Sequence, residues 1–255
     1  MDETTASPAG PDLTTRILRW ILGVTLVLVV GVALWYAYAY AITPAALRRP
    51  VGTHYHFRMQ IIVDGAPVDF ADPKYQTILG QDICTAALTK EPVHFHDKLD
   101  QFVHIHWDHM TGAIVLKDFG WNFIGGTSRT LGYRFDQFPK LIRVPVHGQD
   151  LPKPPIGTHY YIYSGDESSY KTRDWNQFLG TDLRSFFAPA ARTSSWLDRL
   201  IPPAVAAQSN EAQLEKLNDV LGSVVIFAQK TPPTNAQIKD RFAHLVPLPE
   251  STCAG

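Results

Sequence analysis

The sequence predicts an α+β fold, in which a mostly antiparallel β extracytoplasmic domain with C-terminal helices is preceded by one transmembrane helix. Three observations predict this fold. A segment of 23 residues without a charged side chain runs from Trp20 to Ile42. Alternating polar and apolar residues follow it, separated by Gly, Pro and Asn clusters, which is typical of strands with one buried face. Near the C-terminus, apolar residues recur at three- and four-residue spacing, which is typical of helices.

These patterns divide the 255 residues into five segments. They are a disordered tail at 1–15, a transmembrane helix at 16–43, a His-rich β domain at 50–185, a linker or loop rich in Ala, Pro and Ser at 186–209, and a helix-strand-helix segment at 210–255 that completes the domain. Residues 50–255 carry 19 Lys and Arg against 21 Asp and Glu. This near-neutral balance leaves no basic patch for non-specific binding, so we expect no nucleic-acid partner.

The uncharged segment is long enough to cross a membrane. At 1.5 Å per residue it extends about 34 Å, against about 30 Å for the hydrocarbon core of a bilayer. Aromatic residues, which prefer the headgroup layer, lie at both of its ends. We therefore expect residues 20–42 to contact the lipid bilayer. A cleaved signal peptide is the alternative, although the apolar region of a signal peptide is usually only 7–15 residues long.

Flanking charges leave the orientation open, because Arg16 and Arg19 precede the span while Arg48 and Arg49 follow it. The short N-terminal tail favours a cytoplasmic N-terminus and an uncleaved signal anchor. The predicted location is therefore the cytoplasmic (inner) membrane, crossed once, with the C-terminal domain on the extracytoplasmic, periplasmic side.

After the span, the alternation at 54–63 predicts a strand, and Asp64-Gly65 predicts a type I′ hairpin turn into a second strand at 66–70. Further strands are expected at 92–96, 102–107, 113–117, 141–146 and 158–163.

The C-terminal segment has its own helix and strand signals. A helix is expected at 211–221, between Asn210 as N-cap and Gly222 as stop. A buried strand is expected at 223–229. A last helix, capped by Asn235, would turn three apolar side chains inward, namely Ile238, Phe242 and Leu245.

Ten histidines are the unusual feature of the composition. Six of them form three His-x-His pairs with an apolar residue in the middle, namely His54/His56, His94/His96 and His104/His106. In a strand, residues two apart point to the same face, about 6.5–7 Å from each other. Each pair can therefore place two imidazoles on one face while the middle residue enters the core.

The second and third pairs predict a hairpin. A five-residue loop at 97–101 places His94 opposite His104, and His96 opposite Phe102, so that four imidazoles share one face. A four-residue loop would pair the wrong residues and destroy this arrangement. His109 follows within reach of the same face.

Neutral imidazole is a common ligand of zinc and copper, and three histidines with an open position are the catalytic zinc arrangement. The predicted metal ligands are His54, His56, His94, His96, His104, His106 and His109. Two such sets can hold two ions. Asp97, Asp100 and Asp108 are placed as ligands or as partners that orient an imidazole, and Met110 and Cys84 are candidate sulfur ligands of copper. The alternatives are a solvated polar face and a pH-responsive cluster that titrates near pH 6–6.5.

The predicted function is binding of a transition metal, copper or zinc, by a single-pass membrane protein. The alternative is a non-catalytic accessory subunit that docks on a larger membrane protein complex through an aromatic helix face with Tyr36 and Tyr40. Enzymatic activity stays open, since neither a phosphate-binding Gly-rich loop nor a Gly-x-Ser-x-Gly elbow is present. Whether Cys84 and Cys253 pair is also open.

The stretch His-Tyr-His-Phe-Arg-Met-Gln-Ile-Ile-Val-Asp-Gly at 54–65 and the hairpin Val-His-Phe-His-Asp-x4-Phe-Val-His-Ile-His at 93–106 resemble a group of uncharacterised bacterial and archaeal membrane-anchored proteins. Those proteins carry an HxH strand followed by an HxHD…HxH hairpin. The ending at 223–229, with the helix through Phe242, is similar to their final strand and helix, whereas residues 165–210 look like an insertion. Trp107 stands where an acidic residue is common. The resemblance implies the anchor and the His hairpin but no activity.

Overall fold

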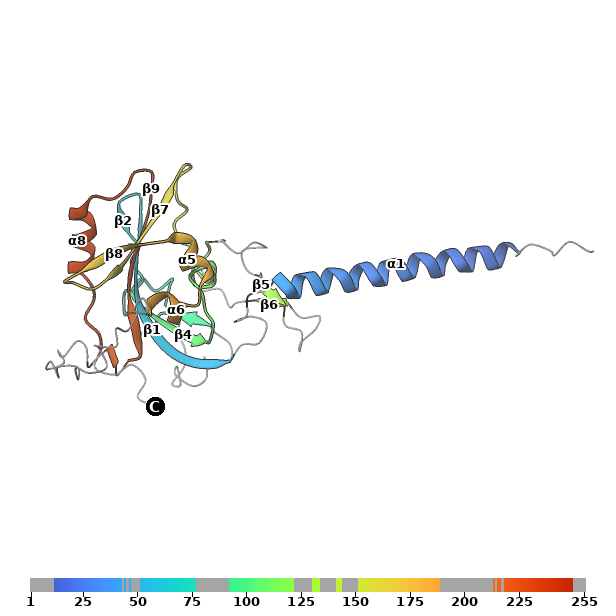
Figure 1. Ribbon diagram of the computed structural model, residues 1–255, viewed down its shortest axis with the longest axis horizontal. Helices are drawn as coiled ribbons and strands as arrows, with labels where there is room; N and C mark the ends of the chain where they lie inside the picture. The colour runs from blue at the N-terminus through green and yellow to red at the C-terminus, as the bar shows by residue number, and fades with distance from the viewer. Residues whose placement is uncertain are drawn as a thin grey trace, which may run out of the picture. The chain divides into compact units, whose positions relative to one another are not determined.

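The computed structural model describes residues 12–42, 44, 46, 51–76, 92–121, 130–133, 141–143, 151–188, 213, 215, 216 and 218–249 (Figure 1). The chain divides into two compact units, Met1–Thr43 and Pro44–Gly255.

The first unit consists of the helix α1 (Leu13–Ile42). It begins earlier than predicted, because the side chain of Asp12 accepts a hydrogen bond from the backbone N–H of Thr15 at 2.8 Å and so caps the helix. Residues 13–15 therefore belong to the helix and not to the tail. The part Leu13–Ala41 is long and apolar enough to cross a membrane, although a signal sequence would have the same character.

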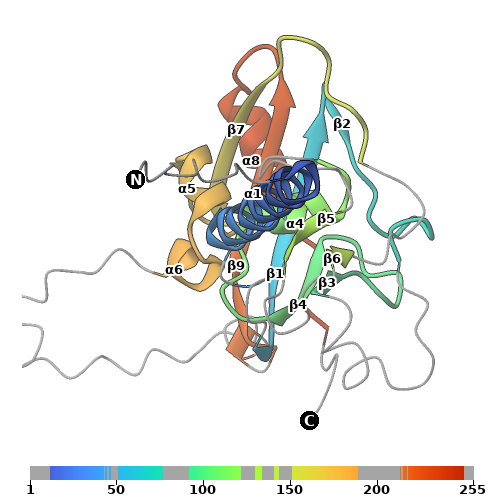
Figure 2. The same ribbon diagram turned by 90° about the vertical axis from the view of Figure 1, so that its right-hand side faces the viewer.

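The second unit is built on a seven-stranded mixed sheet in the order β3-β4-β1-β9-β7-β8, with β2 paired to the end of β1. Figure 2 shows β1 between β4 and β9. The strands are β1 (Gly52–Val63), β2 (Ala66–Pro67), β3 (Val93–His94), β4 (Phe102–Trp107), β7 (His159–Gly165), β8 (Tyr170–Arg173) and β9 (Val220–Gln229). Only the β1–β9 pair is parallel among the described strands. A separate two-stranded sheet joins β5 (Thr130–Tyr133) and β6 (Leu141–Arg143).

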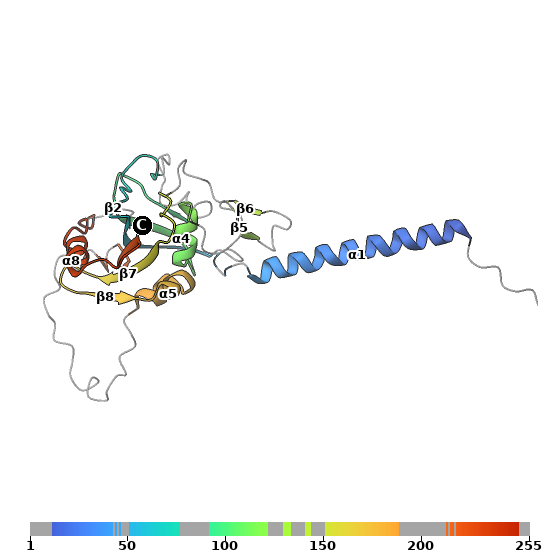
Figure 3. The same cartoon turned by 90° about the horizontal axis from the view of Figure 1, so that it is seen from above.

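The pleat of β1 sorts its side chains between two cores. Tyr55, Phe57 and Met59 enter the larger apolar core, which also takes in the three short helices α4 (Gly112–Asp118), α5 (Trp175–Gly180) and α6 (Leu183–Phe187). On the opposite face, α8 (Asn235–Ala243) packs Ile238 and Phe242 against the sheet. Figure 3 shows α8 on one side of the sheet and α4 with α5 on the other. The β1–β2 turn has positive φ at Asp64 (50°) and Gly65 (86°), as the predicted type I′ hairpin requires.

The predicted strand at 113–117 is wrong, because these residues lie in α4. Thr111 caps this helix by accepting a hydrogen bond from the backbone N–H of Ile114. Every residue from 112 to 117 is buried, Lys117 included, so the apolar residues at 113–116 follow one another without helical periodicity. A short apolar run of this kind does not distinguish a buried strand from a buried helix.

The C-terminal boundaries also shift. The predicted helix at 211–221 ends earlier, because Val220 and Leu221 belong to β9, where Val220 pairs with His56. Residues 213, 215 and 216 are helical. The last helix is capped by Thr234, with Gln237 completing a capping box, and not by Asn235. Ile238 and Phe242 of this helix are buried, as predicted, and Leu245 is buried too but lies beyond the helix, which ends at Ala243.

Other predicted boundaries are met in part. The strand at 102–107 is confirmed, the strand at 92–96 is reduced to Val93–His94, and the strand at 66–70 is reduced to Ala66–Pro67. Residues 186 and 187 lie in α6 and not in a linker, while 189–209 and 144–146 lie outside the described residues. The elements β5, β8, α5 and α6 were not predicted. Asp174 and Asp182, which cap the two helices, are the sequence signal that identifies them.

Candidate metal centre

Three neighbouring strands bring the histidine pairs together. Across β1 and β4, His56 stands opposite His104, and across β3 and β4, His94 stands opposite the same His104. This is the register that the five-residue loop predicts. Because β4 lies between β3 and β1, His104 occupies the centre of the group.

The histidine face is buried and not solvated. His94 and His104 are 0% exposed, His96 and His106 are 1% exposed and His56 is 2% exposed. His54 at the start of β1 is half-buried. The solvated polar face that the sequence left open is therefore wrong. We call the six side chains the histidine cluster, namely His54, His56, His94, His96, His104 and His106.

The six rings are packed against one another. The centroid of the His104 ring lies 4.0 Å from that of His96 and 4.4 Å from that of His56. His106 lies between the two outer strands, with its centroid 4.7 Å from His94 and 5.1 Å from His54. The six imidazole rings thus form one continuous set of ring contacts.

Hydrogen bonds determine which nitrogen carries the proton in two of these rings. Nδ1 of His56 contacts the backbone carbonyl of Asn218, and since a carbonyl only accepts, this nitrogen donates. Nε2 of neutral His56 is then an acceptor, and Nδ1 of His104, at 2.9 Å, donates to it. Nε2 of His104 consequently bears a lone pair. It is buried without a hydrogen-bond partner among the described residues.

His96 is oriented by its own neighbour. Its Nδ1 donates to the carboxylate of Asp97 at 2.7 Å, so its Nε2 also carries a lone pair, buried and without a hydrogen-bond partner in the described part of the chain. This is the carboxylate–histidine arrangement that commonly orients metal ligands. Asp97 and Lys98 both have φ of 57°, and the backbone N–H of Leu99 donates to the carbonyl of His96, as in a type I′ turn. The turn is strained without glycine and sets Asp97 beside His96.

Two groups of three nitrogens are close enough to hold a metal ion. One is His94, His96 and His104, and the other is His54, His56 and His104; in each group the ligand atoms all lie within 4.8 Å of one another. Zinc–nitrogen bonds of about 2.0–2.1 Å in a tetrahedral site place two nitrogens about 3.3 Å apart. Shifts of at most about 1.5 Å, which side-chain rotation can supply, would therefore complete either site.

Burial favours the uncharged form of three histidines of the cluster, His54, His56 and His104. It lowers the pKa of His56 to about 3, against the opposing effect of the Asn218 carbonyl. Burial, with the neighbouring His56 and His96, holds the pKa of His104 well below its usual value, and burial likewise lowers the pKa of His54. These neutral imidazoles are the form that binds metal. His56 and His104, whose pKa values lie this low, do not titrate near pH 6–6.5, so the pH-responsive cluster considered from the sequence does not include these two histidines.

Part of the cover of this face comes from the chain after α8. The side-chain carbonyl of Gln101 accepts from the backbone N–H of Val246 at 3.1 Å. The guanidinium of Arg58 donates to the carbonyl of Val246 at 3.3 Å, and the side chain of Asn218 donates to the carbonyl of Pro249 at 2.9 Å. These polar side chains hold residues 246–249 beside the His56 end of the cluster.

His109, which we predicted to be a ligand of the same site, lies elsewhere. Its backbone turns with a φ of 58°, and its exposed ring lies 3.5 Å from Asp182 and 3.7 Å from Asp108. These three residues form a separate group that can hold an ion, but exposed acidic groups of this kind are common without one. Met110 is buried in the apolar core with Tyr55, so it is not a ligand of the histidine cluster.

Asp100 and the cysteines complete the predicted set. One carboxylate oxygen of Asp100 accepts from the backbone N–H of Phe70 at 2.9 Å, so this side chain joins two loops and does not point to the imidazoles. Cys84 and Cys253 lie outside the described residues, and their pairing stays a prediction.

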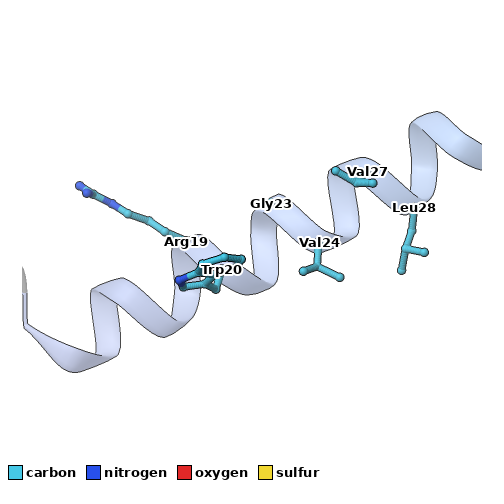
Figure 4. A pocket seen from close by; sticks show the side chains of 6 residues that line it. All are labelled: Arg19, Trp20, Gly23, Val24, Val27 and Leu28. Atoms are coloured by element: carbon cyan, nitrogen blue, oxygen red, sulfur yellow. The ribbon is translucent and has the colours of Figure 1, made fainter.

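A groove on α1 has no comparable chemistry. Figure 4 shows its lining, which is Arg19, Trp20, Gly23, Val24, Val27 and Leu28. Apart from Arg19, these residues are apolar or aromatic, as expected for a helix surface that contacts lipid.

The fold and the cluster thus describe a domain with a buried polyhistidine site that could hold a metal ion. Comparison of the chain with protein families, with curated proteins and with solved structures found no match in any of the three. The resemblance to membrane-anchored proteins with a His hairpin therefore stays a prediction.

Proposed function

We propose that this chain is a single-pass membrane protein whose C-terminal unit binds a transition-metal ion through His94, His96 and His104. One observation carries the proposal: Nε2 of His96 and Nε2 of His104 are buried lone pairs whose rings are each oriented by a hydrogen bond at Nδ1. A buried polar atom without a partner costs about 1–3 kcal/mol. A metal ion bound by both nitrogens would remove that cost.

The donor set favours copper or zinc. Every ligand in the two histidine groups is an imidazole nitrogen, and imidazole suits Zn²⁺ and Cu²⁺ better than Mg²⁺ or Ca²⁺, which prefer oxygen. Lowered pKa values at His54, His56 and His104 keep these nitrogens available at neutral pH.

We further propose that α1 anchors the protein in the cytoplasmic (inner) membrane with the second unit on the extracytoplasmic side. The length and apolar character of Leu13–Ala41 support the anchor. A protease added to intact spheroplasts should digest the C-terminal unit. Protection that is lost only when the membrane is broken would contradict this orientation.

Metal content tests the proposed site directly. The full chain in a mild detergent, stripped with a chelator and then dialysed against Zn²⁺ or Cu²⁺, should retain at least one ion per chain by elemental mass spectrometry. The double variant His94→Ala/His104→Ala should retain none at the cluster. His159→Ala is the matched control, because His159 is an exposed histidine of β7 that belongs to neither group. A wild-type chain that stays empty after loading would overturn the proposal.

A further inference from the structure

His104 belongs to both histidine groups. The other members divide cleanly: His94 and His96 come from β3 and the turn after it, while His54 and His56 come from β1. The two groups therefore draw their other members from strands on opposite sides of β4, the strand that carries His104. His106 is a member of neither group, although its ring contacts one histidine from each.

The two nitrogens of His104 have different surroundings. Nδ1 lies 2.9 Å from Nε2 of His56, on the side of the β1 pair. This leaves Nε2, buried and without a hydrogen-bond partner among the described residues, for His94 and His96. On the β1 side, Nε2 of His54 is likewise buried without a hydrogen-bond partner in the described part of the chain.

We propose that His104 bridges two transition-metal ions as an imidazolate. The first ion is bound by His94, His96 and Nε2 of His104, and the second by His54, His56 and Nδ1 of His104. This inference rests on the proposed function and deepens it from a mononuclear to a dinuclear centre.

Formation of the imidazolate bridge requires His104 to lose one proton and adds one negative charge to the site. The second ion forms a metal–nitrogen bond at Nδ1 of His104 in place of the N–H bond that now donates to His56, and the proton leaves to solvent. His56 needs no such change, because its Nδ1 keeps its hydrogen bond to the Asn218 carbonyl while its Nε2 becomes a ligand. The imidazolate carries one negative charge, which offsets one of the four positive charges that two divalent ions bring into a buried site.

The spacing on the β1 side is close to what an ion requires. The 2.9 Å between Nε2 of His56 and Nδ1 of His104 must open by only about 0.4 Å to reach the spacing of two ligands in a tetrahedral site. The nearby cation Arg58 has its own anionic partner, with a guanidinium nitrogen 3.7 Å from Glu215.

Binding of Cu²⁺ distinguishes the bridged centre from a single ion and from two independent ions. Two Cu²⁺ ions joined by an imidazolate couple their electron spins, which lowers the electron paramagnetic resonance signal. The chelator-stripped full chain in detergent is titrated with Cu²⁺, and bound copper and the integrated electron paramagnetic resonance signal are measured together. We expect two ions per wild-type chain, with clearly fewer than two spins at low temperature. The wild-type measurement needs no variant and so does not depend on how a mutant folds.

Single variants then show which histidines bind each of the two ions. His54→Ala should lose one of two ions and regain a full signal from the ion that stays, while His96→Ala should lose the other. His159→Ala should bind two ions with the coupled signal.

The outcomes distinguish the two proposals. One ion per wild-type chain that is insensitive to His54→Ala would overturn the bridge and leave the mononuclear site intact. Two ions with two full spins would also overturn the bridge. No bound copper and no bound zinc would overturn the proposed function and this inference with it.

Discussion

The two faces of β1 and β4 are equally closed to solvent but are made of opposite kinds of side chain. On one face, Tyr55 and Phe57 of β1 and Ile105 of β4 are each 0% exposed and pack in the large apolar core. On the other face, His56 and His104 are 2% and 0% exposed and contact other imidazoles. Equal burial therefore has opposite energetic consequences on the two sides of the same strands.

Burial of the apolar face stabilises the fold, at about 25 cal/mol for each Å² of apolar surface removed from water. Burial of the histidine face does not, since imidazole nitrogens lose hydrogen bonds to water and three Nε2 atoms regain none among the described residues. We infer that packing of the apolar face holds the strands in register. The strands held in this way keep the imidazoles together despite the free-energy cost of burying them. Sites on such rigid strands hold their geometry well.

The largest effect should come from the apolar face. Phe57→Ala removes a fully buried ring that contacts Phe187, at a centroid distance of 5.6 Å, and should lower the free energy of unfolding by about 3–5 kcal/mol. Denaturant unfolding of the full chain in detergent, followed by circular dichroism, measures this loss.

His96→Leu is the matched change on the histidine face. It removes a buried nitrogen without a hydrogen-bond partner in the described part of the chain, so the metal-free protein should change by less than about 1.5 kcal/mol. If His96→Leu cost as much as Phe57→Ala without metal, the contrast between the faces would fail.

Acid should destabilise the metal-free protein through the histidine face. An unfolded histidine takes up a proton near pH 6.5, whereas burial lowers the pKa of His56 to about 3 in the folded chain. Between these values the unfolded chain binds more protons, so the free energy of unfolding is fully present above about pH 6.5 and falls as the pH drops towards 3. Each such histidine contributes a slope of about 1.4 kcal/mol per pH unit.

His54 and His104 shift in the same direction, so the slope should exceed that of one group. Unfolding curves recorded from pH 8 to pH 4 measure it. His56→Leu should flatten the slope, and an unchanged slope in that variant would show that the acid sensitivity arises elsewhere.

The smallest effect should come from the histidine that lies off this face. His109→Ala should change the free energy of unfolding by less than about 0.5 kcal/mol, because its ring is exposed and its contacts with Asp108 and Asp182 are long. Metal retained at the cluster should not change, as elemental mass spectrometry can check. If this variant lost the metal bound at the histidine cluster, His109 would be a metal ligand after all.

Much of the histidine arrangement could be predicted from local sequence. The alternation of polar and apolar residues in β1 and β4 and the length of the 97–101 loop correctly place His94 opposite His104. The placement of His109 could not be predicted. Its own backbone has a positive φ, so the chain leaves the direction of β4 at this residue. Such a conformation is uncommon outside glycine and leaves no clear mark in the sequence.

The fold shows the same division. The capped helix α8 and the strand β9 are recognisable from their own residues, whereas α4 has no periodicity to identify it because its surroundings bury it on every side. The start of β9 at Val220 depends on parallel pairing with β1, more than 150 positions earlier in the chain.

A span of apolar residues and three histidine pairs that each point to one face can be recognised from local sequence, because both features depend on periodicity over a few residues. Three further features depend on the tertiary fold: this face is buried, His104 lies at its centre, and His109 lies beside Asp108 and Asp182 instead. The reason is physical: the strand order and the segment at 246–249 that covers part of the face come from contacts between residues far apart in the chain. Local patterns determine which way a side chain points, and long-range packing determines what it meets there.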